Sequence, residues 1–435
     1  MNEPQALAAF AAMSQETRLR VVRLLVQAGP DGMAAGAIGE ALGGATTSRA
    51  HTALKIAPHY PSPTVWVKDA SRAVGVAQSL ISRDMRAAFV AANDADYAGI
   101  RERHRNRGDA RRLVSLQKAR GQRFDGGWDD YAPPAPNRPG LHVFEDWPLA
   151  ELVDCIDWSP FFNAWELAGR YPAILDDAIV GTQARELYRD ARAMLATIVE
   201  EKWLTAKAVF GLWPACSIGD DVVVRADSGG TTLHFLRQQV DKPADRPDFC
   251  LADFIAPRET GIPDWIGGFA VTAGIGLDPH VARFEADHDD YNAILLKALA
   301  DRLAEALAER LHQRVRMEYW GYAADETLDN DALIAERYRG IRPAPGYPAC
   351  PDHSEKTTLF ALLDAGANAG MSLTENFAML PTAAVSGYYF SHPRSQYFVV
   401  GRVSREQVAD YARRKGVPLQ QAERWLATQL DYDPQ

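Results

Sequence analysis

AVFGLWPACSIGDDVVVRADSGGTTLHFLRQQ, residues 208–239, contains three apolar or β-branched runs that are separated by two short polar turns. The turns are Gly-Asp-Asp at 219–221 and Ser-Gly-Gly at 228–230. Glycine and aspartate suit tight hairpin turns, and β-rich runs on either side of such turns are typical of antiparallel strands. This stretch therefore predicts a β-meander.

Helices and further strands surround the meander but do not alternate with it. GGFAVTAG, residues 267–274, predicts another strand, and a long helix with one apolar stripe is predicted from near Asp290. VSGYYFS (385–391) and SQYFVVGRV (395–403) predict two strands across a His-Pro-Arg turn, followed by two helices. Segregated helices and strands indicate an α+β fold, with a bent, mostly antiparallel sheet flanked by helices. The apolar stripe consists of Leu296, Leu299, Leu303, Leu307, Leu311 and Val315.

The first 140 residues differ from the rest of the chain. Residues 1–42 predict short helices, and residues 43–90 predict a truncated α/β fragment with a strand at TVWV, residues 64–67. Residues 91–140 predict a charged helix and a proline-rich connector, so we expect the main domain to be 141–435. The arginine-rich part of this linker is either a solvated helix face or a docking patch, and charge runs mostly mark solvated faces.

Composition limits the function classes. The chain has 435 residues, of which 47% are hydrophobic and 24% are charged, and this indicates a globular protein with more than one core. The formal net charge of -10 disfavours binding to nucleic acid or to anionic membranes, which needs clustered lysine and arginine. The four cysteines form no C-x-x-C pair, and no apolar run reaches about 18 residues. We expect a cytoplasmic protein that neither spans a membrane nor is secreted.

Common catalytic motifs are absent from the sequence. There is no G-x-S-x-G, H-E-x-x-H, P-loop or G-x-G-x-x-G pattern, which disfavours standard hydrolases and kinases. We assign no catalytic and no metal-binding residue. The acidic pair Asp289 and Asp290 could be imagined as metal ligands, but at the head of a long helix we expect them to stabilise its positive end.

The segment RPAPGYPACPDHSEK, residues 342–356, interrupts the helical pattern with prolines and a glycine. Prolines fix an extended path and keep backbone groups out of regular secondary structure, where a ligand could use them. Arg342 offers a fork that holds a carboxylate by two hydrogen bonds, and Tyr347 and His353 add an aromatic face and a polar ring. The alternative is a surface loop with a salt-bridged arginine.

Three segments together resemble a known family. Residues 342–356, LTENFAMLPTAAVSGYYFSHPRSQYFVVG (373–401) and DWSPFFNAWELAGRYPAIL (157–175) are similar to the C-terminal activation domain of cobalamin-dependent methionine synthase, and the resemblance covers roughly 146–432. Residues 43–82 resemble the last part of the cobalamin-binding domain of that enzyme. The resemblance implies a module that binds S-adenosylmethionine.

The resemblance also implies binding residues. Asp157 is expected to bind the ammonium of the ligand, and Arg342 is expected to bind its carboxylate. Tyr397 with Phe398 is expected to offer an aromatic face to the sulfonium. Packing within a strand is the alternative for Tyr397, and exposure to solvent is the alternative for Glu305. The remaining residues that the resemblance assigns to the S-adenosylmethionine site are Glu305, Glu336, Tyr347 and His353, and Ala70 matches a position that touches cobalamin.

The implied activity is reductive methylation of an inactive cob(II)alamin, with the electron from a flavodoxin-like donor and the methyl group from S-adenosylmethionine. The homocysteine and folate modules of the methyltransferase are absent from the sequence, as is the D-x-H-x-x-G motif of the cobalamin domain; Asp278 and His280 have Arg283 in place of its glycine. We therefore expect weak or no cobalamin binding by the chain alone, and cobalamin-binding methionine synthase modules as partners in methionine biosynthesis.

Two other hypotheses remain open. Residues 13–43 resemble the start of a winged helix of the arsenic-repressor type, which would suit an S-adenosylmethionine-sensing DNA-binding regulator, but the recognition helix and wing do not follow. The other hypothesis is a non-functional fusion remnant that folds and binds the ligand.

Overall fold

The computed structural model describes residues 49, 52–59, 63–66, 76, 79–80, 82, 85–109, 113–226 and 229–434. The chain divides into two compact units, residues 1–112 and residues 113–435, and each is described by itself. The helices predicted over 1–42 and the residue Ala70 lie outside the described residues. No helix within the described ranges is long and apolar enough to cross a membrane.

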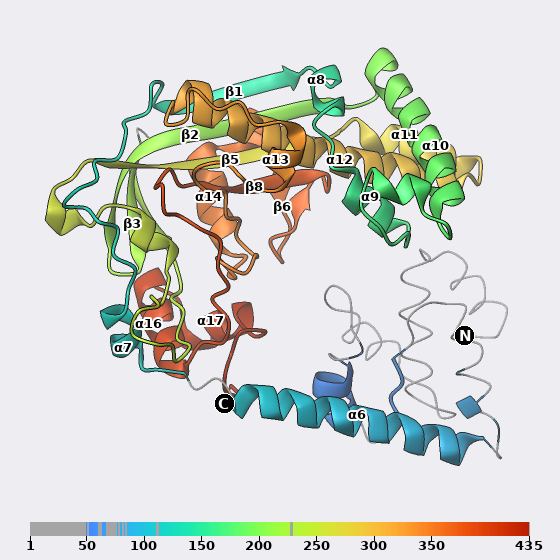
Figure 1. Ribbon diagram of the computed structural model, residues 1–435, viewed down its shortest axis with the longest axis horizontal. Helices are drawn as coiled ribbons and strands as arrows, with labels where there is room; N and C mark the ends of the chain where they lie inside the picture. Colours follow the sequence, from blue (N-terminus) through green and yellow to red (C-terminus); the bar gives the residue numbers. More distant parts are fainter. Residues whose placement is uncertain are drawn as a thin grey trace. The chain divides into compact units, whose positions relative to one another are not determined.

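A long helix, α6 (Arg86–Asp109), organises the described part of the first unit (Figure 1). The Asn93 side chain donates to the carbonyl oxygen of Thr64 (2.9 Å), and the Tyr97 hydroxyl accepts from the backbone N–H of Trp66 (2.7 Å). The strand predicted at 64–67 is therefore wrong for residues 64–66, whose backbone bonds to α6 side chains. The short helices before this segment are η2 (Thr52–Ile56) and η3 (Ala57–His59).

The second unit is built on an antiparallel sheet with the order β4-β3-β2-β5-β8, and β1 pairs with the free half of the β2 edge. The predicted meander is confirmed as the consecutive strands β2, β3 and β4, and the segregation of helices and strands confirms the α+β class. A separate small hairpin contains β6 and β7. The strands are β1 (Gly140–Trp147), β2 (Thr205–Ile218), β3 (Asp221–Ala226), β4 (Gly229–His234), β5 (Asp264–Ile275), β6 (Ser372–Leu373), β7 (Met379–Leu380) and β8 (Ala384–Tyr389).

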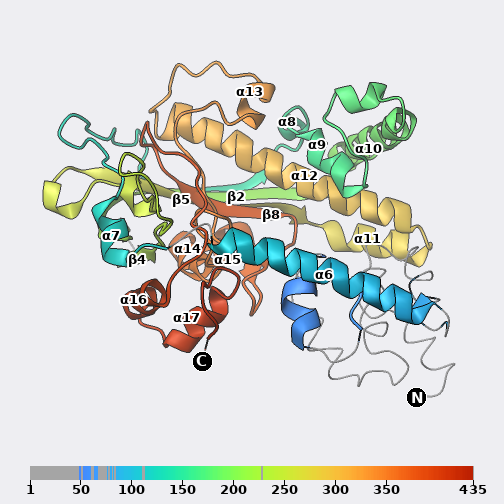
Figure 2. The same ribbon diagram turned by 60° about the horizontal axis from the view of Figure 1, so that its bottom comes forward.

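Helices cover both faces of the sheet (Figure 2). Side chains alternate between the faces of a strand, so the even-numbered residues of β2 from Ala206 to Leu212 join the core with α12, whereas Val209 and Trp213 join the core with α14. The predicted stripe on α12 is confirmed, because all six of its residues have no exposed surface. Burial on both faces makes the central strands nearly continuous apolar runs.

The long helix α12 begins where its acidic residues predict. Asp289 caps the helix, and its carboxylate accepts a hydrogen bond from the backbone N–H of Asn292 (3.1 Å). An aspartate at this position pairs with an otherwise free backbone amide, and its negative charge interacts favourably with the positive end of the helix dipole. The helices of the second unit are α7 (Leu116–Gly121), α8 (Ala150–Val153), α9 (Trp158–Ala164), η4 (Ala173–Asp176), α10 (Gly181–Glu201), η5 (Leu251–Phe254), η6 (Arg258–Thr260), α11 (Leu277–Ala286), α12 (Asp290–Arg314), η7 (Val315–Tyr319), α13 (Asn330–Ile334), α14 (Glu355–Leu363), α15 (Ala365–Ala369), α16 (Arg405–Lys415) and α17 (Leu419–Trp425).

Two further segments differ from their predictions. Residues 395–403 form no strand, because the backbone N–H of Val400 donates to the carbonyl of Pro348 in a loop (2.9 Å) and not to a neighbouring strand. The second half of the predicted linker, from residue 113 onward, is part of the second unit. Leu116 and Ala119 of α7 are buried there, and the indole N–H of Trp320 donates to the carbonyl of Pro134 (2.9 Å).

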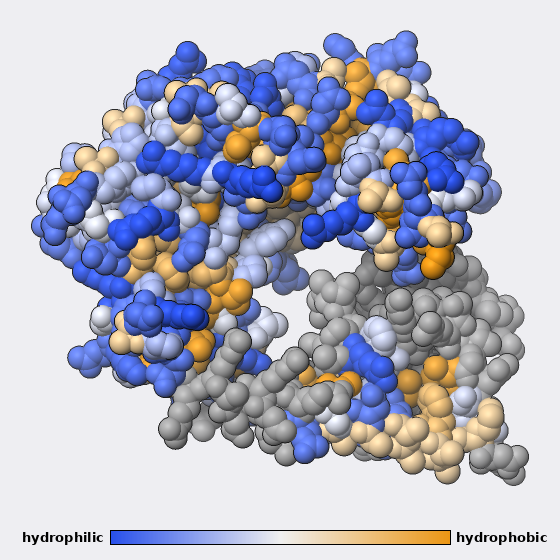
Figure 3. Space-filling view, in the orientation of Figure 1, coloured by the Kyte–Doolittle hydropathy of each residue, from blue (hydrophilic) through white to orange (hydrophobic). Residues whose placement is uncertain are grey.

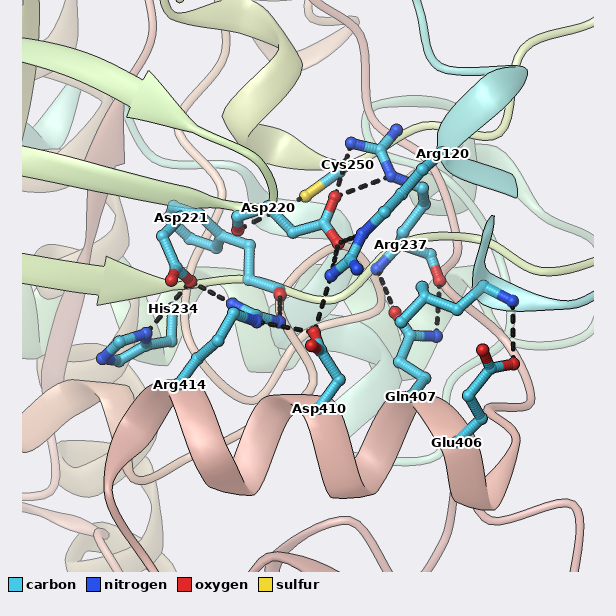
Figure 4. A network of polar contacts seen from close by, with 12 residues as sticks. Arg120, Asp220, Asp221, His234, Arg237, Cys250, Glu406, Gln407, Asp410 and Arg414 are labelled. Carbon is cyan, nitrogen blue, oxygen red and sulfur yellow. Dashed lines mark hydrogen bonds and ion pairs between the residues drawn. The ribbon is translucent and has the colours of Figure 1, made fainter. Parts of the chain in front are cut away.

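The C-terminal helices are held to the sheet by a buried polar network (Figure 4). Arg237, which is 1% exposed, donates to Asp220 Oδ1 (2.7 Å) and to both carboxylate oxygens of Asp253 (2.8 and 2.7 Å). The side chain of Gln407 on α16 accepts from the backbone N–H of Arg237 (2.8 Å) and donates to its carbonyl (3.0 Å). The network fixes α16 relative to the β2–β3 turn.

Candidate functional site

A cleft of about 730 Å³ opens on the second unit, a volume within the range typical of small-molecule sites. Its walls come from the loop 342–349, from 376–379 beside the β6–β7 hairpin, from the start of β8 (384–386), and from 397–399. Figure 3 shows apolar side chains gathered on the surface between α14 and the C-terminal helices. Glu305, Glu336, His353 and Lys356 complete the lining.

The proline-rich loop is held by its own backbone. Gly346 has φ +95°, donates to the carbonyl of Cys350 (2.7 Å), and lies so close to the His353 ring that a side chain at this position would overlap it. This close approach and the positive φ both require glycine. The carbonyls of Pro343 and Pro348 accept from Tyr388 and Val400 (both 2.9 Å). The expectation that this loop leaves its backbone groups free is wrong for these groups.

Arg342 lines the cleft, and its guanidinium is anchored on one side. Its Nη1 contacts Glu309 Oε2 (2.7 Å) and donates to the Tyr338 hydroxyl (2.9 Å). Although burial opposes it, the Glu309 carboxylate raises the pKa of Arg342 above its ordinary value, so the side chain is a permanent cation. The salt-bridged arginine that was the alternative interpretation is therefore present, but it lines a cleft and does not lie on an open surface.

Two carboxylates line the same cleft as this cation. Glu336 adopts φ +55°, a conformation that non-glycine residues rarely take and that is common at functional sites. Partial burial raises the pKa of Glu336, an effect that Arg342 opposes and Glu309 reinforces. Glu305 on α12 is exposed at the cleft, as the alternative interpretation held, and it also lines the wall. The lining thus offers negative charge near a fixed guanidinium.

Aromatic residues cover the other side. The Tyr397 hydroxyl accepts from the backbone N–H of Arg342 (3.1 Å), and the ring is 39% exposed. Phe398 lines the cleft but also packs on Phe249, with ring centroids 5.6 Å apart. Tyr347, at 63% exposed, is one of the most exposed large side chains in the described chain. Tyr397 and Tyr347 therefore present faces that a ligand can cover.

The first turn of α14 connects the cleft to the C-terminal helices. Asp352 and Glu355 point to α16, where the ammonium group of Lys415 binds both, at 3.1 Å from Asp352 Oδ2. His353 and Lys356 lie on the cleft side, and the Lys356 ammonium contacts His353 Nδ1 (2.8 Å). This contact makes Nδ1 the acceptor and leaves the ring proton on Nε2. Burial, reinforced by Lys356, lowers the pKa of His353 and favours the neutral ring.

Seven of the nine predicted binding residues line this one cleft. Asp157 caps α9, where its Oδ1 accepts from the backbone N–H of Ser159 (3.0 Å), and it is not among the lining residues. Helix α9 packs against α12, the helix that carries Glu305 and Glu309. The contact of Asp157 with the ligand ammonium stays a prediction. Ala70 lies outside the described residues. The seven lining residues are Glu305, Glu336, Arg342, Tyr347, His353, Tyr397 and Phe398.

The predictions missed Glu309 and Lys356. Glu309 and His312 on α12 and Arg316 on η7 follow Glu305 at helical spacing and form a polar stripe; these three are at most 7% exposed. Polar groups are rarely buried unless they are paired, so such a stripe marks a structured polar site. Lys356 follows His353 by three positions, the spacing of side chains that share one helix face.

The comparisons with known proteins agree with this geometry. Residues 148–416 match the model of a family described as "Vitamin B12 dependent methionine synthase, activation domain". The chain is 51% identical to a solved structure titled "Crystal Structure of the MetH Reactivation Domain bound to AdoHcy", with a TM-score of 0.72. That alignment covers 74% of this chain and 99% of the other. The predicted resemblance is confirmed, and the chain belongs to the family of vitamin B12-dependent methionine synthase activation domains.

Proposed function

We propose that the cleft binds S-adenosylmethionine and that the second unit presents its methyl group to a cobalamin held by a partner module. The observation that carries the proposal is the fixed guanidinium of Arg342 in a cleft that aromatic and acidic residues also line. The related reactivation domain was solved with AdoHcy, the demethylated form of this ligand. The family match does not favour the DNA-binding alternative.

The side chains suit the three charged groups of the ligand. Arg342 binds the carboxylate through paired hydrogen bonds. Tyr397 and Tyr347 offer aromatic faces, which attract a sulfonium through the ring quadrupole. Glu305 and Glu336 give the lining negative charge that favours a cationic ligand, and we propose that Asp157 takes the ammonium.

The role of the chain in the transfer is to position the ligand. A bound sulfonium transfers its methyl group as a cation equivalent and leaves as a neutral thioether, so the protein has no proton to move at the reacting carbon. Holding the headgroup converts a bimolecular encounter into an effectively unimolecular step. The electron needed to reduce cob(II)alamin comes from a separate donor, which we propose to be flavodoxin-like. The described cysteines are all free, which fits a cytoplasmic location.

Calorimetric titration of the full chain with S-adenosylmethionine tests the proposal. We expect saturable binding in the micromolar range, about -8 kcal/mol, because the arginine fork and the aromatic faces are already formed. Adenosine, which has the base and sugar but no charged headgroup, is the control and should bind at least about 10-fold more weakly. Absence of saturable S-adenosylmethionine binding at millimolar concentration would overturn the proposal.

We propose that cobalamin-binding modules of methionine synthase supply the cobalamin, the methyl acceptor. The described residues of the first unit form only short helices, one extended segment and α6, and they do not form the doubly wound sheet on which a corrin site of this type is built. A titration of the chain with hydroxocobalamin, followed by its visible spectrum, should show weak or no binding. Tight uptake of one equivalent would contradict this expectation.

A further inference from the structure

The guanidinium of Arg342 has one occupied edge and one open edge. Nη1 carries two N–H groups; it lies 2.7 Å from Glu309 Oε2 in an ion pair and donates a hydrogen bond to the Tyr338 hydroxyl (2.9 Å). A longer contact of 3.4 Å joins Nη1 to His312 Nδ1. Among the described residues, Nε and Nη2 have no hydrogen-bond partner. Because Nη1 is saturated, a ligand carboxylate has to bind the Nε–Nη2 edge.

The groups that occupy Nη1 are fixed in the protein interior. The Glu309 side chain is 9% exposed and that of Arg342 is 18% exposed, and Tyr338 is 8% exposed. Glu309 Oε1 is buried and has no hydrogen-bond partner within the described chain, so Arg342 is the principal group that compensates its charge. Separating a buried pair leaves an uncompensated charge, which is strongly unfavourable. Glu309 therefore holds the guanidinium in one orientation.

An arginine side chain that is free to rotate loses rotamer entropy when a ligand immobilises it. Here that ordering is complete before any ligand arrives, because Glu309 and Tyr338 set the plane of the fork. The pair Glu309–Arg342 is also neutral as a unit, so the cleft attracts a carboxylate by the geometry of the open edge rather than by an excess of positive charge. Selectivity for a carboxylate then depends on the orientation of the fork.

We propose that Glu309 is a positioning residue that gives the cleft its selectivity for ligands with an α-carboxylate. It acts through Arg342, whose Nε–Nη2 edge it turns toward the bound headgroup. This inference rests on the proposed binding of S-adenosylmethionine and adds to it a residue outside the cleft lining. The competing explanation is that Glu309 only neutralises a buried cation, in which case it affects stability and all ligands alike.

A comparison of two ligands separates these explanations. Decarboxylated S-adenosylmethionine keeps the adenosine, the sulfonium and the amine but lacks the carboxylate. The wild-type chain should bind S-adenosylmethionine about 100-fold more tightly, because two charge-assisted hydrogen bonds are lost with the carboxylate. In Glu309→Gln, which keeps the side-chain shape, we expect this preference to fall about 10-fold, with the affinity for the decarboxylated ligand unchanged, because a guanidinium released from its anchor loses much of the paired geometry.

Glu326→Gln is the matched control. Glu326 forms a buried pair with Arg316 (2.6 Å), and Arg316 stacks on the ring of the same Tyr338 (4.2 Å), but neither residue lines the cleft. The ligand preference of Glu326→Gln should equal that of the wild type, even if its thermal stability falls as far as that of Glu309→Gln. Tyr338→Phe removes the other acceptor of Nη1 and should lower the preference about 3-fold, as expected for one neutral hydrogen bond; it serves if Glu309→Gln does not fold.

The outcomes differ in what they exclude. If both ligands weaken equally in Glu309→Gln, the residue is only structural and the inference is wrong. An unchanged preference in both Glu309→Gln and Tyr338→Phe overturns it as well. If the wild-type chain binds neither ligand, the proposed function itself fails, which is a separate result.

Discussion

Arg342→Ala is expected to lower the affinity for S-adenosylmethionine by at least about 100-fold, the largest effect of any single change in the cleft. The substitution removes both hydrogen bonds to the ligand carboxylate, and a hydrogen bond to a charged group contributes about 1.5–3 kcal/mol. Each 1.4 kcal/mol is a factor of about ten in affinity. Isothermal titration calorimetry of the variant beside the wild type measures the loss.

Stability has to be separated from recognition in this test. Removing Arg342 alone leaves Glu309 buried without its cation (2.7 Å in the intact pair), which costs about 3–5 kcal/mol. The double variant Arg342→Gln with Glu309→Gln removes both charges and should be folded at the assay temperature, as circular dichroism can verify. Arg342→Lys keeps the charge but loses the fork, so about a 10-fold loss is expected. Near-wild-type affinity in the double variant would show that the carboxylate binds elsewhere.

Local sequence patterns predicted the main elements because the apolar residues of each element repeat with a single spacing, that of a strand or that of a helix. The meander at 208–239 has turn residues that few other conformations need, and the stripe from Leu296 to Val315 repeats at helical spacing over about five turns. The segment 395–403 shows where this reasoning fails. Phe398 and Val400 point inward while Tyr397 and Val399 point outward, which is the period of a strand. Periodicity reports burial, however, and the backbone bonds here go to a loop.

The predicted binding residues come from a family resemblance and not from a physical pattern. An aspartate before a helix, such as Asp157, is equally consistent with an N-cap and with a ligand contact, and the structure shows the cap. The polar stripe from Glu305 to Arg316 was visible in the sequence, because a buried helix with charged residues at helical spacing needs partners. The contact of Lys415 with Asp352 had no local signal, since 63 residues separate them.

Arg237→Met is expected to destabilise the second unit by about 3–5 kcal/mol, because it leaves Asp253 buried without its cation and Asp220 with Arg120 alone. The side chains of Asp220 and Asp253 are 0% and 3% exposed, and Arg237 is within 2.7 Å of both. Urea unfolding followed by circular dichroism should show a lower midpoint with an unchanged slope. Arg189→Met, which breaks a surface pair with Asp190, is the control and should cost less than about 1 kcal/mol.

The pH dependence should reveal the cause of this loss. Burial already raises the pKa of Asp253 above its ordinary value, and Arg237 opposes that rise. Without the arginine the folded-state pKa rises further, so protonation on lowering the pH favours the folded variant. The destabilisation of Arg237→Met relative to the wild type should therefore be largest near neutral pH and should shrink as the pH falls toward the unfolded pKa, about 3.9. A loss that is independent of pH would attribute the effect to missing packing rather than to charge.

The same reasoning distinguishes uncompensated charge from lost contacts. Arg237→Met combined with Asp220→Asn and Asp253→Asn removes the cation and both anions, and buried ion networks are often replaceable by neutral groups at little net cost. The triple variant should therefore recover much of the stability that the single variant loses. Arg120 would then keep its other partner, Asp410 of α16 (2.6 Å). If the triple variant is less stable than Arg237→Met, the hydrogen bonds of the network, including those to Gln407, contribute more than the charges cost, and α16 depends on them for its attachment to the sheet.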